Sequence, residues 1–133
     1  LGYSLGGLAA LYYYFELGFA GCISCSGSLW YPGFQDYCRE QIEKKLQEKE
    51  MRIKDSVYFS LGGKEKNTTD PSMCHIEEDT RWIYEAFQKV AQTTFVHEPG
   101  GHMCKVERRL AHGLIWLLSD KKQLPGKRSL RLH

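Results

Sequence analysis

The chain has 133 residues, of which 42% are hydrophobic, 13% aromatic and 26% charged, a composition typical of a globular domain and not of a disordered or fibrous chain. The formal net charge is only +2, too small to predict binding to nucleic acid. No apolar run approaches the roughly 20 residues that cross a bilayer, so the sequence predicts neither a membrane partner nor a nucleic-acid partner.

The first recognisable element is a G-x-S-x-G pentapeptide that runs from Gly2 to Gly6, with Ser4 at its centre. The apolar run over 7–17 predicts a helix that ends at Gly18. This pattern is typical of a nucleophile elbow, in which a strand turns sharply into a helix and the serine at the turn exposes its hydroxyl. We therefore interpret Ser4 as a nucleophile for acyl carbons. A side chain at Gly2 or Gly6 is expected to collide with the neighbouring strand and helix.

The rest of the chain alternates strands and helices. Residues 19–24 predict a short buried strand, and 26–33 predict a loop rich in turn formers and aromatic side chains, of the kind that lines ligand sites at the C-terminal edge of a parallel sheet. Periodicity predicts helices over 34–51, 76–91 and 107–118, and strands over 56–61 and 94–97. The alternation predicts an α/β fold with parallel strands.

The last predicted helix closes the domain. The stripe expected to face the core consists of Val106, Leu110, Leu114 and Leu117. Beyond Ser119 the sequence has no periodicity. We therefore expect a domain over 1–119 and a basic, flexible tail over 120–133.

The five cysteines form an odd set without metal-ligand spacing: Cys22, Cys25, Cys38, Cys74 and Cys104. Cys22 and Cys25 are three residues apart on a predicted strand and should point to opposite faces, which argues against a redox pair. We favour buried free cysteines in a reducing, cytoplasmic compartment over disulfides, with secretion left open as the alternative, and we expect no bound metal.

A serine hydroxyl needs a base to remove its proton, and His102 is the best candidate. It follows a predicted strand end through two glycines and precedes a helix, so its imidazole can reach the elbow. The other histidines are interpreted as surface or structural residues: His75, His97, His112 and His133.

The third group is an acid that orients the imidazole, and in this order of elements it falls between the serine and the histidine. Glu65 is placed best, because it comes just after the strand that ends at Leu61. Asp70 is the second choice, since its loop is long enough to fold back. Asp79 is the third, because it lies on a predicted helix.

The oxyanion of an acyl-transfer reaction needs hydrogen-bond donors, and the backbone N–H of Leu5 is placed to supply one at the positive end of the first helix. A second donor normally comes from a loop near the start of the sheet. Only Leu1 precedes the pentapeptide, so we expect the chain to be the C-terminal half of a larger enzyme. Alone it should be nearly inactive and could self-associate through an exposed sheet edge.

Together these motifs carry a family resemblance. The segments that carry it are 2–7, 26–30, 62–65, 99–102 and 114–118. On these segments the chain resembles the esterase family of α/β hydrolases that contains siderophore esterases, S-formylglutathione hydrolase, feruloyl esterases and mycolyltransferases. The resemblance covers residues 1 to about 119. It implies the C-terminal part of an α/β-hydrolase fold, with parallel strands alternating with helices, that acts on small-molecule carboxylic esters without metal or organic cofactor.

The resemblance also implies roles for individual residues. Ser4 matches the nucleophile, His102 the base and Glu65 the acid. The substrate-facing positions are Tyr3, Ser28, Trp30 and Tyr31. The segment 26–30 is most similar to the siderophore esterase branch, some members of which work with a serine and a histidine and a weak or displaced acid, so a Ser4–His102 dyad is an alternative to the triad.

The predicted function is therefore ester hydrolysis through an acyl-enzyme on Ser4, with His102 as the base. The alternatives are an acyltransferase that uses the same site, in which an alcohol takes the acyl group, and a non-catalytic fragment or interaction module that keeps the motif by descent.

Overall fold

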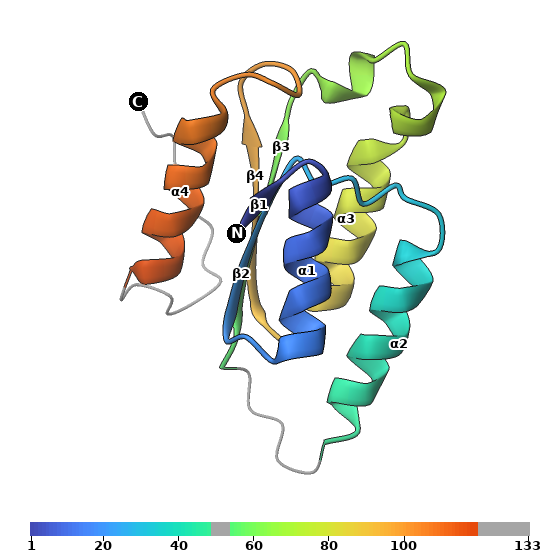
Figure 1. The fold of residues 1–133 in the computed structure, drawn as a ribbon, viewed down its shortest axis with the longest axis vertical. Coiled ribbons are helices and arrows are strands. Elements are labelled where there is room, and N and C mark those ends of the chain that lie inside the picture. Colours follow the sequence, from blue (N-terminus) through green and yellow to red (C-terminus); the bar gives the residue numbers. More distant parts are fainter. Residues whose placement is uncertain (49–53, 120–133) are drawn as a thin grey trace.

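A computed structural model describes residues 1–48 and 54–119 of the chain (Figure 1). In chain order the elements are β1 (Gly2–Tyr3), α1 (Leu5–Leu17), β2 (Gly21–Cys25), α2 (Phe34–Leu46), β3 (Ser56–Gly62), the short 3-10 helices η1 (Glu65–Asn67) and η2 (Pro71–Met73), α3 (Ile76–Phe87), β4 (Gln92–Glu98) and α4 (Val106–Leu118). The predicted tail over 120–133 lies outside the described residues.

The four strands form one sheet in the order β1-β2-β3-β4, and every pair is parallel. Helices α1, α2 and α3 cover one face, and α4 lies on the other (Figure 1). This arrangement confirms the predicted α/β fold. Because parallel strands all end at the same edge of a sheet, the segments that follow β1, β2, β3 and β4 meet there.

The predicted elements are present with shifted ends. The helix predicted over 34–51 ends at Leu46, and the helix predicted over 76–91 ends at Phe87. The strands predicted over 19–24 and 94–97 run from Gly21 to Cys25 and from Gln92 to Glu98. Within the described ranges, no helix has both the length and the apolar character that a bilayer crossing requires.

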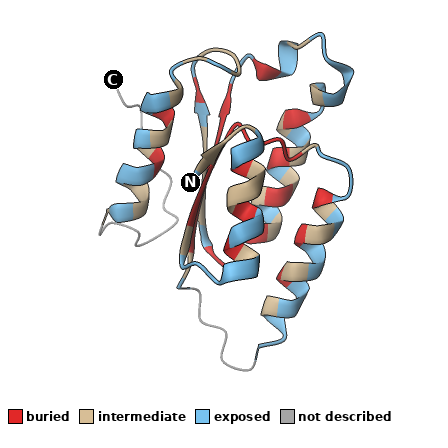
Figure 2. Ribbon diagram, viewed as in Figure 1, coloured by how far each residue is buried: buried red, intermediate tan, exposed pale blue. Residues whose placement is uncertain are grey.

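Alternate side chains of the strands enter two separate cores, as the pleat of a strand dictates. Figure 2, which colours the ribbon by burial, shows β2 and β3 largely buried between the helices. On β3, Val57 and Phe59 pack under α1 and α3, whereas Tyr58 packs under α4. Cys22 belongs to the first core and Cys25 to the second. This confirms that these two cysteines point to opposite faces of the sheet.

Helix α4 faces the core with part of the predicted stripe, since Leu110 and Leu117 pack against the sheet. Leu114, predicted to face the core, is 38% exposed, and the residues buried on this helix are Arg109 and Gly113. A Cβ at Gly113 would lie only 2.6 Å from Ile23 Cγ2 and 3.1 Å from a ring carbon of Tyr58. Glycine therefore allows α4 to approach β2 and β3 closely, and this approach buries Arg109 one turn earlier.

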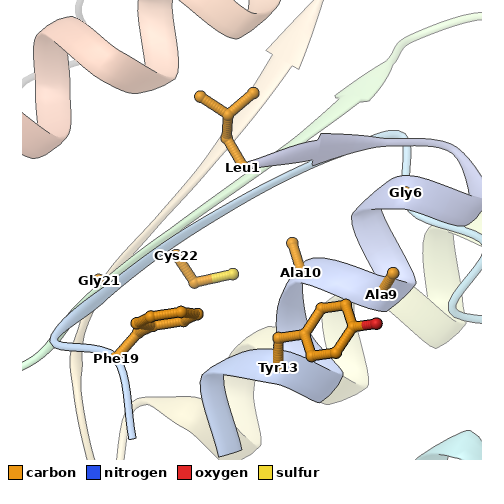
Figure 3. A pocket seen from close by; sticks show the side chains of 8 residues that line it. All are labelled: Leu1, Gly6, Ala9, Ala10, Tyr13, Phe19, Gly21 and Cys22. Atoms are coloured by element: carbon orange, nitrogen blue, oxygen red, sulfur yellow. The ribbon is translucent and has the colours of Figure 1, made fainter. Parts of the chain in front are cut away.

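A hollow lies beside β1, which is an edge strand of the described sheet (Figure 3). Its volume is about 310 Å³, and it is lined by Leu1, Gly6, Ala9, Ala10, Tyr13, Phe19, Gly21 and Cys22. Leu1, Tyr13 and Phe19 are 61%, 51% and 52% exposed, so its wall is open and apolar. None of the predicted site residues lines this hollow, and the predicted self-association through the sheet edge stays a prediction.

We expect Gly113→Val to destabilise the protein by about 1–3 kcal/mol, because the new side chain has no room against Ile23 and Tyr58. Ala111→Val is the matched control on the same helix. Ala111 is exposed, so its replacement should cost only the weaker helix propensity of valine, about 0.5 kcal/mol. Urea unfolding followed by circular dichroism measures both. An equal loss of stability in the two variants would contradict the close approach of α4.

The thiols should differ in reactivity. All five cysteines are free, but Cys74 is exposed and Cys104 half-buried, so the prediction of five buried thiols is wrong for these two. Burial raises the pKa of Cys22 and of Cys38 to about 12 and also raises that of Cys25. Because the thiolate is the reactive form, iodoacetamide at pH 8 should modify Cys74 first and the three buried thiols only after unfolding. Peptide mass mapping measures this order, and early labelling of Cys22 would contradict it.

Candidate active site

Ser4 occupies the turn between β1 and α1 in a strained backbone conformation, with φ 55° and ψ −122°. Such a positive φ is costly for a residue with a side chain and persists only where surrounding contacts impose it. Here the Ser4 amide donates to the Cys25 carbonyl at 3.0 Å, and the Ser4 carbonyl accepts from the Ser28 amide at 3.0 Å. The turn is thereby fixed to the C-terminal end of β2.

Of the two glycines predicted to be required around Ser4, the structure confirms one. A Cβ at Gly2 would overlap the Gly6 carbonyl, which confirms the expected need for glycine there. A Cβ at Gly6 would meet no atom within 4 Å, so the predicted collision at that position is wrong. The crowded position is Gly7, where a Cβ would lie 2.9 Å from Gly27 Cα and 2.9 Å from Ser24 Oγ.

His102 lies between Ser4 and Glu65. It follows β4, and its side chain is 26% exposed. Its Nε2 is 2.9 Å from Ser4 Oγ, and its Nδ1 is 2.8 Å from Glu65 Oε2. An ionised carboxylate can only accept hydrogen bonds, so Nδ1 carries the proton and Nε2 offers its lone pair to the serine hydroxyl.

Glu65 is a buried carboxylate at the start of η1. Its Oε1 accepts hydrogen bonds from the Gly62 amide at 2.6 Å, from the Ser26 hydroxyl and from Arg109 Nη2 at 3.3 Å. Burial of a carboxylate is expensive unless such partners compensate for lost water. These three donors fix the carboxylate and leave Oε2 for His102.

The other two acids considered from the sequence do not contact His102. Asp70 is exposed and caps η2, where it accepts hydrogen bonds from the amide and hydroxyl of Ser72. Asp79 lies on α3 and accepts from Gln35 Nε2 at 2.9 Å. Of the three acids, the structure brings only Glu65 to the imidazole.

The remaining histidines of the described residues pair with acids elsewhere. His75 lies 3.2 Å from Glu78, His97 3.2 Å from Glu77, and His112 2.8 Å from Glu98. His133 lies outside the described residues. In residues 1–48 and 54–119, no three His, Cys, Asp or Glu side chains gather closely enough to hold a metal ion.

Leu5 is the first residue of α1. Amides of the first helical turn have no acceptor within the helix and lie at the positive end of its dipole. The Leu5 N–H is therefore free of helical bonding directly beside Ser4, where an anion would be stabilised.

The three residues predicted in the loop after β2 lie at different depths. Ser28 is buried and its amide holds the Ser4 carbonyl. Trp30 is half-buried, and its indole Nε1 lies buried with no hydrogen-bond partner in the described part of the chain. Tyr31 is exposed. Tyr31 is therefore the one of the three that is openly available to a ligand.

Tyr3, also predicted to face substrate, directs its hydroxyl into the protein. This hydroxyl donates to the His102 carbonyl and accepts from Arg109 Nη1. Burial raises the pKa of Tyr3 above its ordinary value, against the opposing effects of Ser26 and Arg109. The hydroxyl therefore stays protonated and able to donate at neutral pH.

Sequence reasoning missed Arg109. It is 1% exposed and contacts Tyr3, Ser26 and Glu65. A signal was present, because Arg109 stands three residues after Val106 and four before Gly113, on the stripe of the helix that faces the sheet. A charged residue at such a position indicates a buried partner of opposite charge.

No protein-family model matches the sequence, and no curated protein matches it. Among solved structures, the chain is similar to the siderophore hydrolase EstB from Aspergillus nidulans, with a TM-score of 0.59 and 22% identity over 96% of this chain and 50% of that chain. It is also similar to the siderophore hydrolase EstA from Aspergillus nidulans, with a TM-score of 0.62 and 16% identity over 88% of this chain and 46% of that chain. The chain therefore spans about half the length of these structures and shares their fold over that part.

Proposed function

We propose that the chain carries the nucleophile, base and acid of a serine hydrolase that cleaves carboxylic esters through an acyl-enzyme. The observation that carries the proposal is the row of contacts from Ser4 Oγ to His102 Nε2 at 2.9 Å and from His102 Nδ1 to Glu65 Oε2 at 2.8 Å. The strained serine at a strand-to-helix turn supports it, since this is the geometry of a nucleophile elbow. The fold shared with two named hydrolases adds support.

The acylation step follows from these positions. Ser4 Oγ attacks the ester carbonyl carbon while His102 Nε2 takes the hydroxyl proton. Glu65 keeps the imidazole in the tautomer with Nδ1 protonated and stabilises the imidazolium that forms. When the tetrahedral intermediate collapses, the C–O bond to the alcohol breaks. The imidazolium gives its proton to the leaving alkoxide, and the acyl group remains on Ser4.

Deacylation runs the same steps with water as the nucleophile. His102 Nε2 takes a proton from the water as its oxygen attacks the acyl carbon, and returns it to Ser4 Oγ as the acid product leaves. The Leu5 N–H at the start of α1 is the proposed donor to the oxyanion in both halves of the reaction. If an alcohol replaced water in this half, the site would transfer the acyl group instead.

The substrate would lie over Ser4 beside the loop after β2. Tyr31 is exposed there, and Trp30 is half-buried next to it, their rings 6.5 Å apart between centroids. Such a pair offers an apolar wall for the acyl or alcohol part of an ester. Siderophore esters are the first substrates to test, because both similar structures are named siderophore hydrolases.

A fluorophosphonate probe tests the nucleophile. We expect the protein, expressed from its complete coding sequence, to gain the mass of one adduct, and Ser4→Ala to gain none, because the probe reacts with an activated serine. Ser72→Ala is the matched control, since Ser72 is exposed and contacts Asp70, away from His102. Intact-mass spectrometry measures the adduct. A folded protein that gains no adduct, or a Ser4→Ala variant that still gains one, would overturn the proposal.

Glu65→Gln tests the acid. Loss of the charge that fixes the tautomer of His102 should lower the rate of ester hydrolysis on the order of 10⁴-fold. Asp70→Asn removes a carboxylate from the same stretch of chain and should leave the rate unchanged, because Asp70 bonds only within its own turn. Steady-state hydrolysis of a nitrophenyl ester measures both variants. A Glu65→Gln rate close to that of the parent protein would favour the dyad of Ser4 and His102.

A further inference from the structure

We propose that Arg109 is a positioning residue of this site: its guanidinium orients the Glu65 carboxylate and, through the Tyr3 hydroxyl, holds the backbone of His102. The inference rests on the proposed function, because it assigns how the acid and the base of that reaction are kept in register. Arg109 contacts neither Ser4 nor the imidazole, so it acts through other residues.

The position of Arg109 is set by helix α4. Gly113 lets this helix lie against β2 and β3, and the Arg109 side chain then extends, 1% exposed, toward the C-terminal edge of the sheet. Its guanidinium carbon lies 5.1 Å from the centre of the Tyr3 ring, a cation–π contact. The cation is thereby enclosed on the face of the sheet opposite α1.

One terminal nitrogen of Arg109, Nη2, positions the acid Glu65. Arg109 Nη2 donates to the Ser26 hydroxyl and lies 3.3 Å from Glu65 Oε1. The Ser26 hydroxyl in turn donates to the same carboxylate oxygen. Arg109 therefore reaches Oε1 both directly and through Ser26. The rotation of the carboxylate that would carry Oε2 away from His102 is blocked.

The other terminal nitrogen of Arg109, Nη1, positions the loop that carries the base His102. Arg109 Nη1 donates to the Tyr3 hydroxyl, and that hydroxyl donates to the carbonyl of His102. Tyr3 is the residue directly before Ser4, so this chain of bonds ties the histidine loop to the strand that carries the nucleophile. One planar group thus sets the position of the acid and of the loop that bears the base.

A lysine cannot replace this arrangement. The guanidinium presents several N–H donors in a fixed plane, whereas an ammonium is a single flexible point charge. Arg109 uses its two terminal nitrogens for different partners, one on β1 (Tyr3) and the other directly after β2 (Ser26). A lysine would retain the positive charge near Glu65. It could not donate to Tyr3 and to Ser26 at the same time in the geometry that the guanidinium provides.

The test compares Arg109→Met, Arg109→Lys and the control Arg108→Met, in the protein expressed from its complete coding sequence. Arg108 stands on the same helix but is exposed and contacts His112. We expect Arg109→Met to lower kcat for ester hydrolysis about 100-fold with KM unchanged, since misplaced groups lose orientation and not substrate contact. Arg109→Lys should also lower kcat, though by a smaller factor, and Arg108→Met should have the kcat of the parent protein. An Arg109→Met variant that keeps the parent kcat would overturn the proposal.

A second readout does not depend on any substrate. The proton between His102 Nδ1 and Glu65 should give a downfield proton resonance in the parent protein and in Arg108→Met, and this resonance should shift or broaden in Arg109→Lys. If the parent protein fails to label with fluorophosphonate, the proposed function fails, and this resonance still decides the role of Arg109. A resonance that is the same in Arg109→Lys and in the parent would overturn it.

Tyr3→Phe keeps the test decisive if Arg109→Met does not fold. It removes only the hydroxyl that joins Arg109 to the His102 carbonyl and leaves the ring over the guanidinium. We expect a lower kcat with unchanged KM in a variant that still folds, which circular dichroism checks. A Tyr3→Phe variant with the parent kcat would overturn the proposal that Arg109 positions His102 through the Tyr3 hydroxyl.

Discussion

The arrangement of the strand ends in this four-stranded sheet depends on one buried carboxylate, that of Glu65. A carboxylate without water must have its oxygens bonded, or the cost of burial is several kcal/mol. Its donors come from the end of β2 (Ser26), the end of β3 (Gly62), the loop after β4 (His102) and the opposite face of the sheet (Arg109). Satisfying this one group therefore draws together segments that are distant in the sequence. The same contacts aim Oε2 at the imidazole.

Backbone strain gathers around the same group. The non-glycine residues with positive φ in the described part of the chain are Ser4, Ser26 and Lys105. Ser4 contacts His102, Ser26 donates to Glu65, and Lys105 begins the helix that carries Arg109. Such conformations persist only where other contacts over-determine them. Ser4 and Ser26 directly follow β1 and β2, and Lys105 directly precedes α4, so each strained residue lies next to an element that supplies a group to the site.

The sequence predicted the order of elements and the meeting of Ser4, Glu65 and His102, because each follows a strand end and parallel strands end at one edge. It did not predict Arg109. An arginine in an amphipathic helix usually marks the solvent face, whereas this one shares the buried face of α4 with Gly113, whose missing side chain allows the helix to approach the sheet. The sequence also assigned the crowded position of the helix start to Gly6, whereas the structure places it at Gly7. A sequence pattern gives the residue type that a turn needs, but the crowding of a position comes from segments such as 24–27 that pack on it later.

The ion pair of Arg109 and Glu65 is better explained by orientation than by stability. A buried pair gains attraction but loses hydration, and well-packed apolar side chains of similar volume are often as stable. An apolar pair, however, could not direct a carboxylate oxygen at His102 or hold the His102 carbonyl through Tyr3. The buried charges also leave a cost, since Arg109 Nε is buried with no partner among the described residues. A protein that retains an incompletely bonded cation beneath its candidate site gains from where that cation places its neighbours.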